Sequence, residues 1–312
     1  MNLTDPIFTD ETKAREHFEA LRWPNGPYCP HCGEVERLSR LHGKSHRPGL
    51  VQCNACNEAF TVTVGTVMER SHVPLNKWAL AFRLMCSSKK GISAHQLHRT
   101  LSVTYKTAWF MAHRIREAMR PMTAETGGGQ LGGKNKVVEV DETYVGGKAR
   151  NRKNHVPPKE AVVALVERDG RVRSHHVPTV NGATLKPILR SEIDKASYVM
   201  TDESPVYPGI AGGFGGHGTV NHSIEEYVRG AFWHTNTAES YFSIFKRGVI
   251  GTYHHVSAEH LKRYLGEFDF RHNERIALGV DDTQRTAKAI KGAAGKRLTY
   301  RQAGRGGEEI PF

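Results

Sequence analysis

The sequence has 312 residues, enough for roughly two or three domains. Its 44 lysines and arginines outnumber 32 aspartates and glutamates, and the net charge of +12 favours a polyanionic partner, most often nucleic acid. No apolar run approaches the length of a membrane span and the N-terminus lacks the features of a signal peptide, so we expect no membrane association.

Four of the five cysteines form two pairs with CxxC spacing. Twenty residues separate the pair Cys29 and Cys32 from the pair Cys53 and Cys56. Each pair can direct two thiolates at one ion, and two pairs complete the tetrahedral site that zinc prefers. The alternative is four unrelated buried or redox-active thiols, but paired spacing suits metal binding in a reducing cytoplasm better than disulfides. We therefore predict a structural Zn²⁺ site in an N-terminal domain of one helix and a zinc ribbon, residues 1–68.

Residues 69–126 are predicted to form a helical DNA-binding region. Apolar residues recur at helical spacing over 74–86, a short helix follows, and a longer one covers 104–119. A short helix, a tight turn and a longer helix are typical of a helix-turn-helix motif. Between Arg70 and Arg120 there are ten basic residues and one glutamate. This charge favours contacts with DNA phosphates over the alternative, a three-helix bundle with a solvated basic face.

The longer of these helices has an apolar and a basic side. Ala108, Met111 and Ile115 are expected to pack against the other helices. Lys106 and Arg114 are predicted to face DNA.

A strand with a carboxylate near its centre follows a glycine-rich linker, residues 127–136. Valines alternate with polar residues over 136–144, which predicts a strand with Glu139, Asp141 and Thr143 on one face. A carboxylate in the middle of such a strand is costly unless it is paired, solvated or bound to a metal. Asp141 is therefore predicted to be the first ligand of a metal site.

The elements after this strand predict a ribonuclease H-like fold. They are two strands, a helix and a further strand, over 161–167, 172–180, 182–193 and 198–201. Three antiparallel strands, a helix and another strand are the order of that fold, which sets acidic residues of its first and fourth strands side by side. Asp202 ends the last of these strands, so we predict that it meets Asp141.

A helix predicted over 234–248 offers further polar side chains. Glu239 and Lys246 are seven residues apart, nearly two turns, so they share a face, on which Asn236 also lies. Taken alone, an ordinary amphipathic helix with a solvated Glu and Lys explains the pattern as well. Gly248 is predicted to end the helix.

The segments VEVDETYVGGK, TDE and HTNTAESYFSIFKRG, with the cysteine pairs and the helices before them, resemble bacterial insertion-sequence transposases. The resemblance is to the group with an N-terminal zinc ribbon and a DDE-type catalytic domain, and covers about residues 12–275. It implies an α+β multi-domain protein whose catalytic domain, residues 137–278, contains a mixed sheet. The basic tail, residues 279–312, is expected to be a loose arm or a short helix, either on DNA phosphates or solvated.

The resemblance also implies roles for individual residues. Asp141 and Asp202 match the first two catalytic acids, which would hold Mg²⁺ or Mn²⁺. The third position is open between Asn236 and Glu239, and the spacing to Lys246 favours Glu239.

The implied activity is DNA cleavage at the ends of the element, followed by strand transfer into target DNA. Lys246 and Arg247 would contact DNA phosphates. The active complex is expected to be a homo-oligomer, at least a dimer, in the bacterial cytoplasm and associated with the nucleoid. Two alternatives are a ribonuclease H-fold nuclease without strand transfer and a DNA-binding regulator with an inactive catalytic domain.

Overall fold

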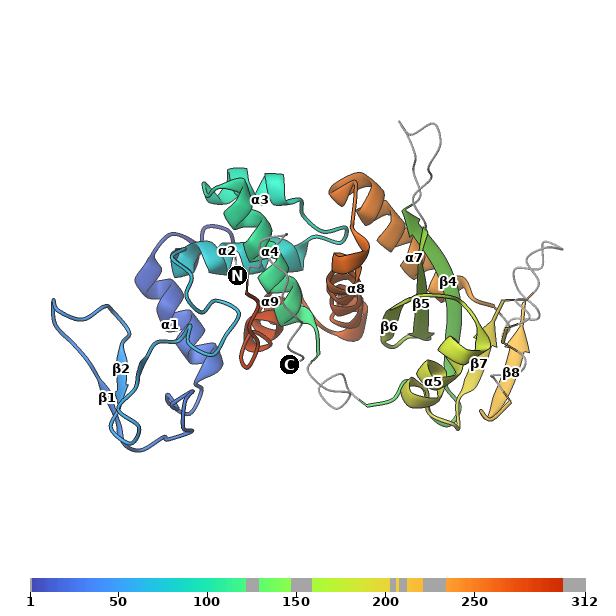
Figure 1. Ribbon diagram of the computed structural model, residues 1–312, viewed down its shortest axis with the longest axis horizontal. Coiled ribbons are helices and arrows are strands. Elements are labelled where there is room, and N and C mark those ends of the chain that lie inside the picture. Colours follow the sequence, from blue (N-terminus) through green and yellow to red (C-terminus); the bar gives the residue numbers. More distant parts are fainter. Residues whose placement is uncertain are drawn as a thin grey trace, which may run out of the picture. The chain divides into compact units, whose positions relative to one another are not determined.

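A computed structural model describes most of the chain, drawn as coloured ribbon in Figure 1: residues 2–121, 129–146, 159–202, 206–207, 212–220 and 234–299. The chain divides into two compact units. The first comprises Met1–Phe82, Ala94–Ala118 and Ile290–Phe312, and the second comprises Arg83–Ser93 and Met119–Ala289. Among the described residues, no helix has both the length and the apolar character needed to cross a membrane.

A small antiparallel sheet carries the cysteine pairs of the first unit. Its strands, in sheet order, are β1 (Leu38–Arg40), β2 (Val51–Cys53) and β3 (Ala59–Phe60). Tight turns shape both pairs, because the backbone N–H of Cys29 donates to the carbonyl of Glu34 and that of Cys53 donates to the carbonyl of Glu58. These turns bring the two cysteines of each pair to the same side of the backbone, as a zinc ribbon requires.

Helix α1 (Glu11–Arg22) precedes this sheet and follows a short 3-10 turn, η1 (Pro6–Phe8). Asp10 caps α1, since its Oδ1 accepts hydrogen bonds from the backbone N–H groups of the second and third helical residues. Phe18 on the buried side of α1 packs edge-to-face against Phe82, with ring centroids 6.3 Å apart. This contact joins α1 to the helical part of the same unit.

Three helices follow, α2 (Leu75–Ser87), α3 (Ala94–Leu101) and α4 (Tyr105–Met119). The turn between α3 and α4 is tight, and Ser102 within it has a φ of +49°. Thr104 then caps α4 by accepting a hydrogen bond from the backbone N–H of Thr107 at 3.2 Å. Leu97 of α3 and Ile115 of α4 are fully buried. The predicted pattern of short helix, tight turn and longer helix is therefore present.

A five-stranded mixed sheet frames the second unit (Figure 1). Its strands are β4 (Val137–Gly146), β5 (Lys159–Glu167), β6 (Val172–Val177), β7 (Tyr198–Thr201) and β8 (Gly216–Thr219). They are ordered β6-β5-β4-β7-β8, with the first three antiparallel and the last two parallel to β4. The order is that of a ribonuclease H-like fold, which confirms the predicted fold class. Strand β8 was not predicted, because its sequence GHGT has no β-branched alternation.

Helices cover both faces of this sheet. They are α5 (Gly182–Glu192) on one face and α7 (Asn236–Gly248) and α8 (Ala258–Asn273) on the other. The unit also contains a 3-10 turn, η4 (Ile276–Leu278), and the start of α9 (Asp282–Lys291). The residues of β5 alternate between two apolar layers. Val162 and Ala164 pack with α7 and α8, whereas Val163 and Leu165 pack with α5 on the opposite face.

Helix α7 ends at Gly248, as predicted, but Gly248 does not adopt the left-handed conformation of a glycine cap. Gly248 has right-handed helical angles, and the chain continues as a π-helical turn, η3 (Val249–Tyr253). Close packing explains the glycine instead. A Cβ atom at this position would lie 2.4 Å from Cζ of Phe268 and 2.8 Å from the carbonyl oxygen of Lys90. The absence of a side chain therefore lets the segment around Lys90 approach the backbone of α7.

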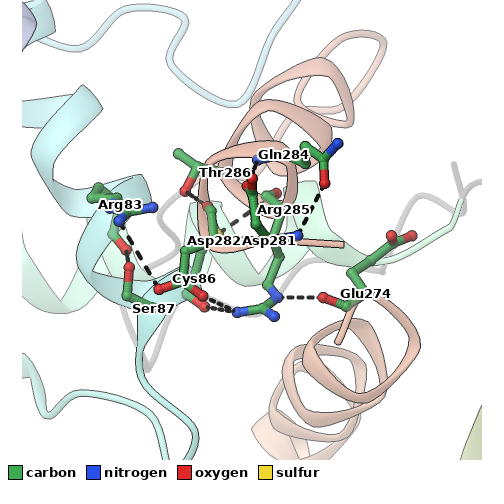
Figure 2. A network of polar contacts seen from close by, with 9 residues as sticks. All are labelled: Arg83, Cys86, Ser87, Glu274, Asp281, Asp282, Gln284, Arg285 and Thr286. Carbon is green, nitrogen blue, oxygen red and sulfur yellow. Dashed lines mark hydrogen bonds and ion pairs between the residues drawn. The ribbon is translucent and has the colours of Figure 1, made fainter. Parts of the chain in front are cut away.

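A polar network joins α9 to the ends of α2 and α8 within the second unit (Figure 2). The buried guanidinium of Arg285 donates to the carbonyl oxygens of Cys86 at 2.9 Å and Glu274 at 2.5 Å, and to Asp282 Oδ1 at 2.7 Å. The described part of the tail, residues 279–299, thus contains a short helix, α9, and Arg285 packs within the second unit. Residues 300–312 of the tail lie outside the described residues.

Replacing Gly248 by alanine should destabilise the second unit by about 1–3 kcal/mol. The added methyl group would collide with the ring of Phe268 and with the carbonyl oxygen of Lys90. The matched control is Gly251→Ala, where an added Cβ meets no atom within 4 Å. Urea unfolding measures both free energies. Equal unfolding free energies for the two variants would show that close packing does not explain Gly248.

Candidate active site and zinc centre

The four paired cysteines converge on one point in the first unit. The Sγ atoms of Cys29 and Cys56 lie 3.7 Å apart, as do those of Cys32 and Cys53. All four Sγ atoms lie within 4.8 Å of one another. Four thiolates around zinc at about 2.3 Å would be separated by roughly 3.8 Å in a tetrahedron. The donor set and its spacing therefore fit a structural Zn²⁺ ion.

Three carboxylates converge at a second point, in the sheet of the second unit. Oxygen atoms of Asp141, Glu142 and Asp202 lie within 4.8 Å of one another. The pairing of β4 with β7 reaches Glu139 opposite Met200, after which β4 continues while β7 ends. Asp202 follows the end of β7 directly and so comes next to the middle of β4. The structure thus brings Asp141 and Asp202 together.

Glu142 was not among the residues predicted for this site. Strand alternation puts it on the face opposite Asp141, beside the α5 layer, and its carboxylate accepts a hydrogen bond from the hydroxyl of Tyr207. Its backbone N–H donates to Asp141 Oδ1 at 2.8 Å. The open end of β7 lets carboxylates from both faces of β4 approach Asp202. The only sequence signal for Glu142 was its position next to Asp141.

Burial and mutual repulsion oppose the ionised form of these acids. The pKa of Asp141 is raised to about 7, mainly by burial and also by the charges of Glu142, Asp202 and Glu239. Burial also raises the pKa of Glu142. A divalent cation between these oxygens would remove the repulsion and restore the ionised forms. Oxygen donors of this kind suit Mg²⁺ or Mn²⁺.

Helix α7 supplies one wall of the cavity in front of Asp141. Glu239, Ser243, Lys246 and Arg247 line this cavity together with Asp141. The seven-residue spacing places Glu239 and Lys246 on the same side of the helix, and Arg247, the next residue, also reaches the cavity. Asn236 is exposed at the first position of α7 and is not among the residues that line the cavity.

Glu139 connects β4 to the start of α7. Its fully buried carboxylate accepts hydrogen bonds from the backbone N–H groups of Thr237 at 2.8 Å and Ala238 at 3.0 Å. Arg168 at the end of β5 donates to it from Nε at 2.6 Å. In the described part of the chain, Thr235 at the N-cap position makes no side-chain capping bond. A carboxylate from another element therefore caps α7 and compensates its N-terminal partial charge.

The two DNA-binding residues predicted on α4 differ in exposure. Lys106 is exposed in the first turn of the helix. Arg114 is half-buried, donates from Nη1 to the carbonyl oxygen of Glu69 at 3.0 Å, and lies over the ring of Phe110. Burial lowers its pKa. Its guanidinium is thus held within the first unit, which reduces its availability to DNA.

Comparison with known proteins identifies relatives over most of the chain. Residues 130–273 match the ISXO2-like transposase domain, and residues 9–59 match the transposase zinc-ribbon domain. A protein of Halobacterium salinarum, described as an uncharacterized protein in transposable element ISH50, is 29% identical over 283 residues, 85% of this chain and 91% of that protein.

Two solved structures have a distant likeness to the chain. The crystal structure of the Mos1 strand transfer complex is 12% identical, with a TM-score of 0.28 over 69% of this chain and 74% of that one. The crystal structure of a pre-cleavage Mos1 transpososome is also 12% identical, with a TM-score of 0.24 over 71% and 80%. With TM-scores this low, no residue correspondence follows from either.

The purified protein should contain one zinc ion per chain, because four thiolates surround one point at tetrahedral spacing. Cys53→Ser should lose the metal, whereas Cys86→Ser, which changes a buried cysteine outside the cluster, should keep it. Elemental analysis of the three proteins measures the ratio. A metal-free wild-type protein, or zinc retained in Cys53→Ser, would contradict the assignment.

Glu139→Ala should destabilise the second unit by about 3–5 kcal/mol, because it leaves the charge of Arg168 and two helix N–H groups without their buried acceptor. The control is Glu160→Ala, which breaks the more exposed pair with His176 and should cost about 0–1 kcal/mol. Denaturant unfolding followed by circular dichroism compares them. If Glu139→Ala lowered the unfolding free energy no more than Glu160→Ala does, the hydrogen bonds of Glu139 would not be what anchors α7.

Proposed function

We propose that this chain, which belongs to the insertion-sequence transposases with an N-terminal zinc ribbon and a DDE-like catalytic domain, is a DNA transposase that works by metal-dependent cleavage and strand transfer. The observation that carries the proposed mechanism is the convergence of Asp141, Glu142 and Asp202 beside Glu239 of α7. Phosphodiester cleavage requires neutralisation of an anionic substrate, and clustered carboxylates provide the ligands for the cations that do so.

In this proposal Asp141 and Asp202 hold Mg²⁺ or Mn²⁺ at the open end of β7. The bound cations would neutralise charge on the scissile phosphate and on the attacking and leaving oxygens. The carboxylates would fix where the cations bind. Water is the nucleophile for cleavage, and the freed 3′-hydroxyl group is the nucleophile for strand transfer. No covalent bond between the protein and DNA is needed.

We assign the third catalytic position to Glu239 and not to Asn236. Glu239 lines the same cavity as Asp141, and its charge raises the pKa of the Asp141 carboxyl group. A charged carboxylate also binds Mg²⁺ better than the amide of Asn236. Glu142 lies close enough to be an additional ligand or to orient the others.

The cationic side of α7 supports a role in holding DNA. Lys246 and Arg247 are exposed at the cavity, where they can bind phosphates on either side of the scissile bond. The net charge of +12 supports a wider sequence-independent attraction to DNA. A homo-oligomer in the active complex and a nucleoid-associated location remain predictions from the sequence. A regulator with a degenerate site would lack one of the acids, and all of them are present here.

Asp141→Asn and Asp202→Asn should each abolish cleavage while DNA binding stays nearly unchanged, because each keeps the side-chain size and removes a metal-binding charge. Glu239→Gln should lower the cleavage rate at least 100-fold, corresponding to about 2.7 kcal/mol, and Asn236→Ala should stay within a few-fold of wild type.

The assay is Mg²⁺-dependent nicking of a labelled duplex that carries the DNA at one end of the element. Full activity of either aspartate variant would refute the metal mechanism. Full activity of Glu239→Gln with an inactive Asn236→Ala would instead assign the third position to Asn236.

A further inference from the structure

One residue of the catalytic cavity comes from a part of the sequence far from the catalytic segments. Lys90 lines the cavity together with the carboxylates Asp141 and Glu142 of β4 and with residues of α7 that include Glu239 and Lys246. It belongs to Arg83–Ser93, a stretch of the second unit that lies in the sequence between two segments of the first unit. Neither the transposase domain match, residues 130–273, nor the zinc-ribbon match includes it.

The turn that carries Lys90 has a defined conformation. Ser88 Oγ donates a hydrogen bond to the carbonyl oxygen of Gly91 at 2.6 Å, and the backbone N–H of Gly91 donates to the carbonyl oxygen of Ser88 at 3.4 Å. Gly91 has a φ of +89°, a conformation that favours glycine. The side chain of Lys90 therefore starts from a fixed backbone position.

Two glycines let this turn pack closely against the helices of the catalytic unit. A Cβ atom on Gly91 would lie 1.8 Å from the hydroxyl oxygen of Tyr253, which itself donates to the buried carboxylate of Glu267 at 2.6 Å. On the other side, Gly248 of α7 leaves room for the carbonyl oxygen of Lys90. Packing on η3, α7 and α8 thus holds Lys90 at the cavity, although residue 90 is separated from Asp141 by fifty residues of sequence.

The charge of Lys90 is available to a ligand in this cavity. The residue is exposed, and it forms no ion pair with any residue that the structure describes. The carboxylates of the cavity are those that would bind the catalytic cations, so they are not lasting partners for an ammonium group. A flexible, strongly hydrated ammonium at the edge of such a site suits a phosphate oxygen.

We propose that Lys90 binds a backbone phosphate of the DNA strand held in the catalytic cavity, so that the turn between α2 and α3 supplies part of the active site. The inference rests on the proposed function, since it assumes that the cavity holds DNA for cleavage. Because α3 begins at Ala94, the segment that leads into the helix-turn-helix also contacts DNA at the site of cleavage. Binding by those helices and positioning of the scissile phosphate are thereby linked through one short stretch of chain.

The test compares Lys90→Ala with Lys89→Ala in the full-length protein, using the labelled duplex with the element's end. Lys89 is the matched control because it is adjacent and exposed but does not line the cavity. Lys90→Ala should lower kcat/KM for cleavage by roughly tenfold, and the slope of log kcat/KM against log salt concentration should become shallower by about 0.9, the value for one lost phosphate contact. Lys90→Arg should restore most of the rate, and thermal unfolding should be unchanged in all three variants.

Two results would overturn the inference. One is a Lys90→Ala variant that matches Lys89→Ala in both rate and salt slope. The other is a loss of rate with an unchanged salt slope or with a lowered melting temperature, which would assign Lys90 a structural role. Asp141→Asn, measured in parallel, separates this inference from the proposed function. If Asp141→Asn is inactive while Lys90→Ala cleaves like wild type, only the role of Lys90 is wrong.

Discussion

The buried carboxylate of Glu139 fixes the relative position of the two elements from which the candidate active site is built. It lies on β4 two residues before Asp141, and it accepts hydrogen bonds from the first turn of α7 and from Arg168. Because α7 is rigid, fixing its first turn also fixes Glu239 and Lys246 further along it. A buried charge is costly without partners. The buried carboxylate of Glu139 is therefore stable only when β4, the first turn of α7 and Arg168 are all in place. The geometry of the site thus depends on the correct assembly of the whole unit.

Opposite charges are arranged on different elements around the cavity. The carboxylates of β4 and Asp202 lie at the open end of β7, while the cations come from α7 and from the turn that holds Lys90. This separation suits a reaction on a phosphodiester, in which divalent cations bind the carboxylates and the flanking phosphates bind lysine and arginine. Burial, together with the charges of neighbouring acids, raises the pKa of Asp141, and bound cations would favour its ionised form.

Much of this arrangement was predictable because it depends on short-range patterns. Strand alternation placed Asp141 on the α7 face, and helical spacing placed Glu239 and Lys246 on one side of α7. The same patterns failed where packing decides the outcome. Alternation puts Glu142 on the opposite face of β4, yet its carboxylate still reaches Asp202. Gly248 ends α7 as predicted, but the pattern of a helix end did not reveal its close contact with Phe268 and Lys90.

The sequence by itself determined the resemblance to insertion-sequence transposases, the paired spacing of four cysteines, most of the helices and strands, and the polar residues on each element. Cysteine spacing, side-chain periodicity and capping residues act over a few positions along the chain, so they can be read without knowing the fold. Only the tertiary structure decided which of these residues meet. The place where β7 ends beside β4, the capping of α7 by Glu139 and the docking of the Lys90 turn on two glycines all join segments tens of residues apart. Such contacts depend on strand order and on close packing of side chains, and neither leaves a local pattern in the sequence.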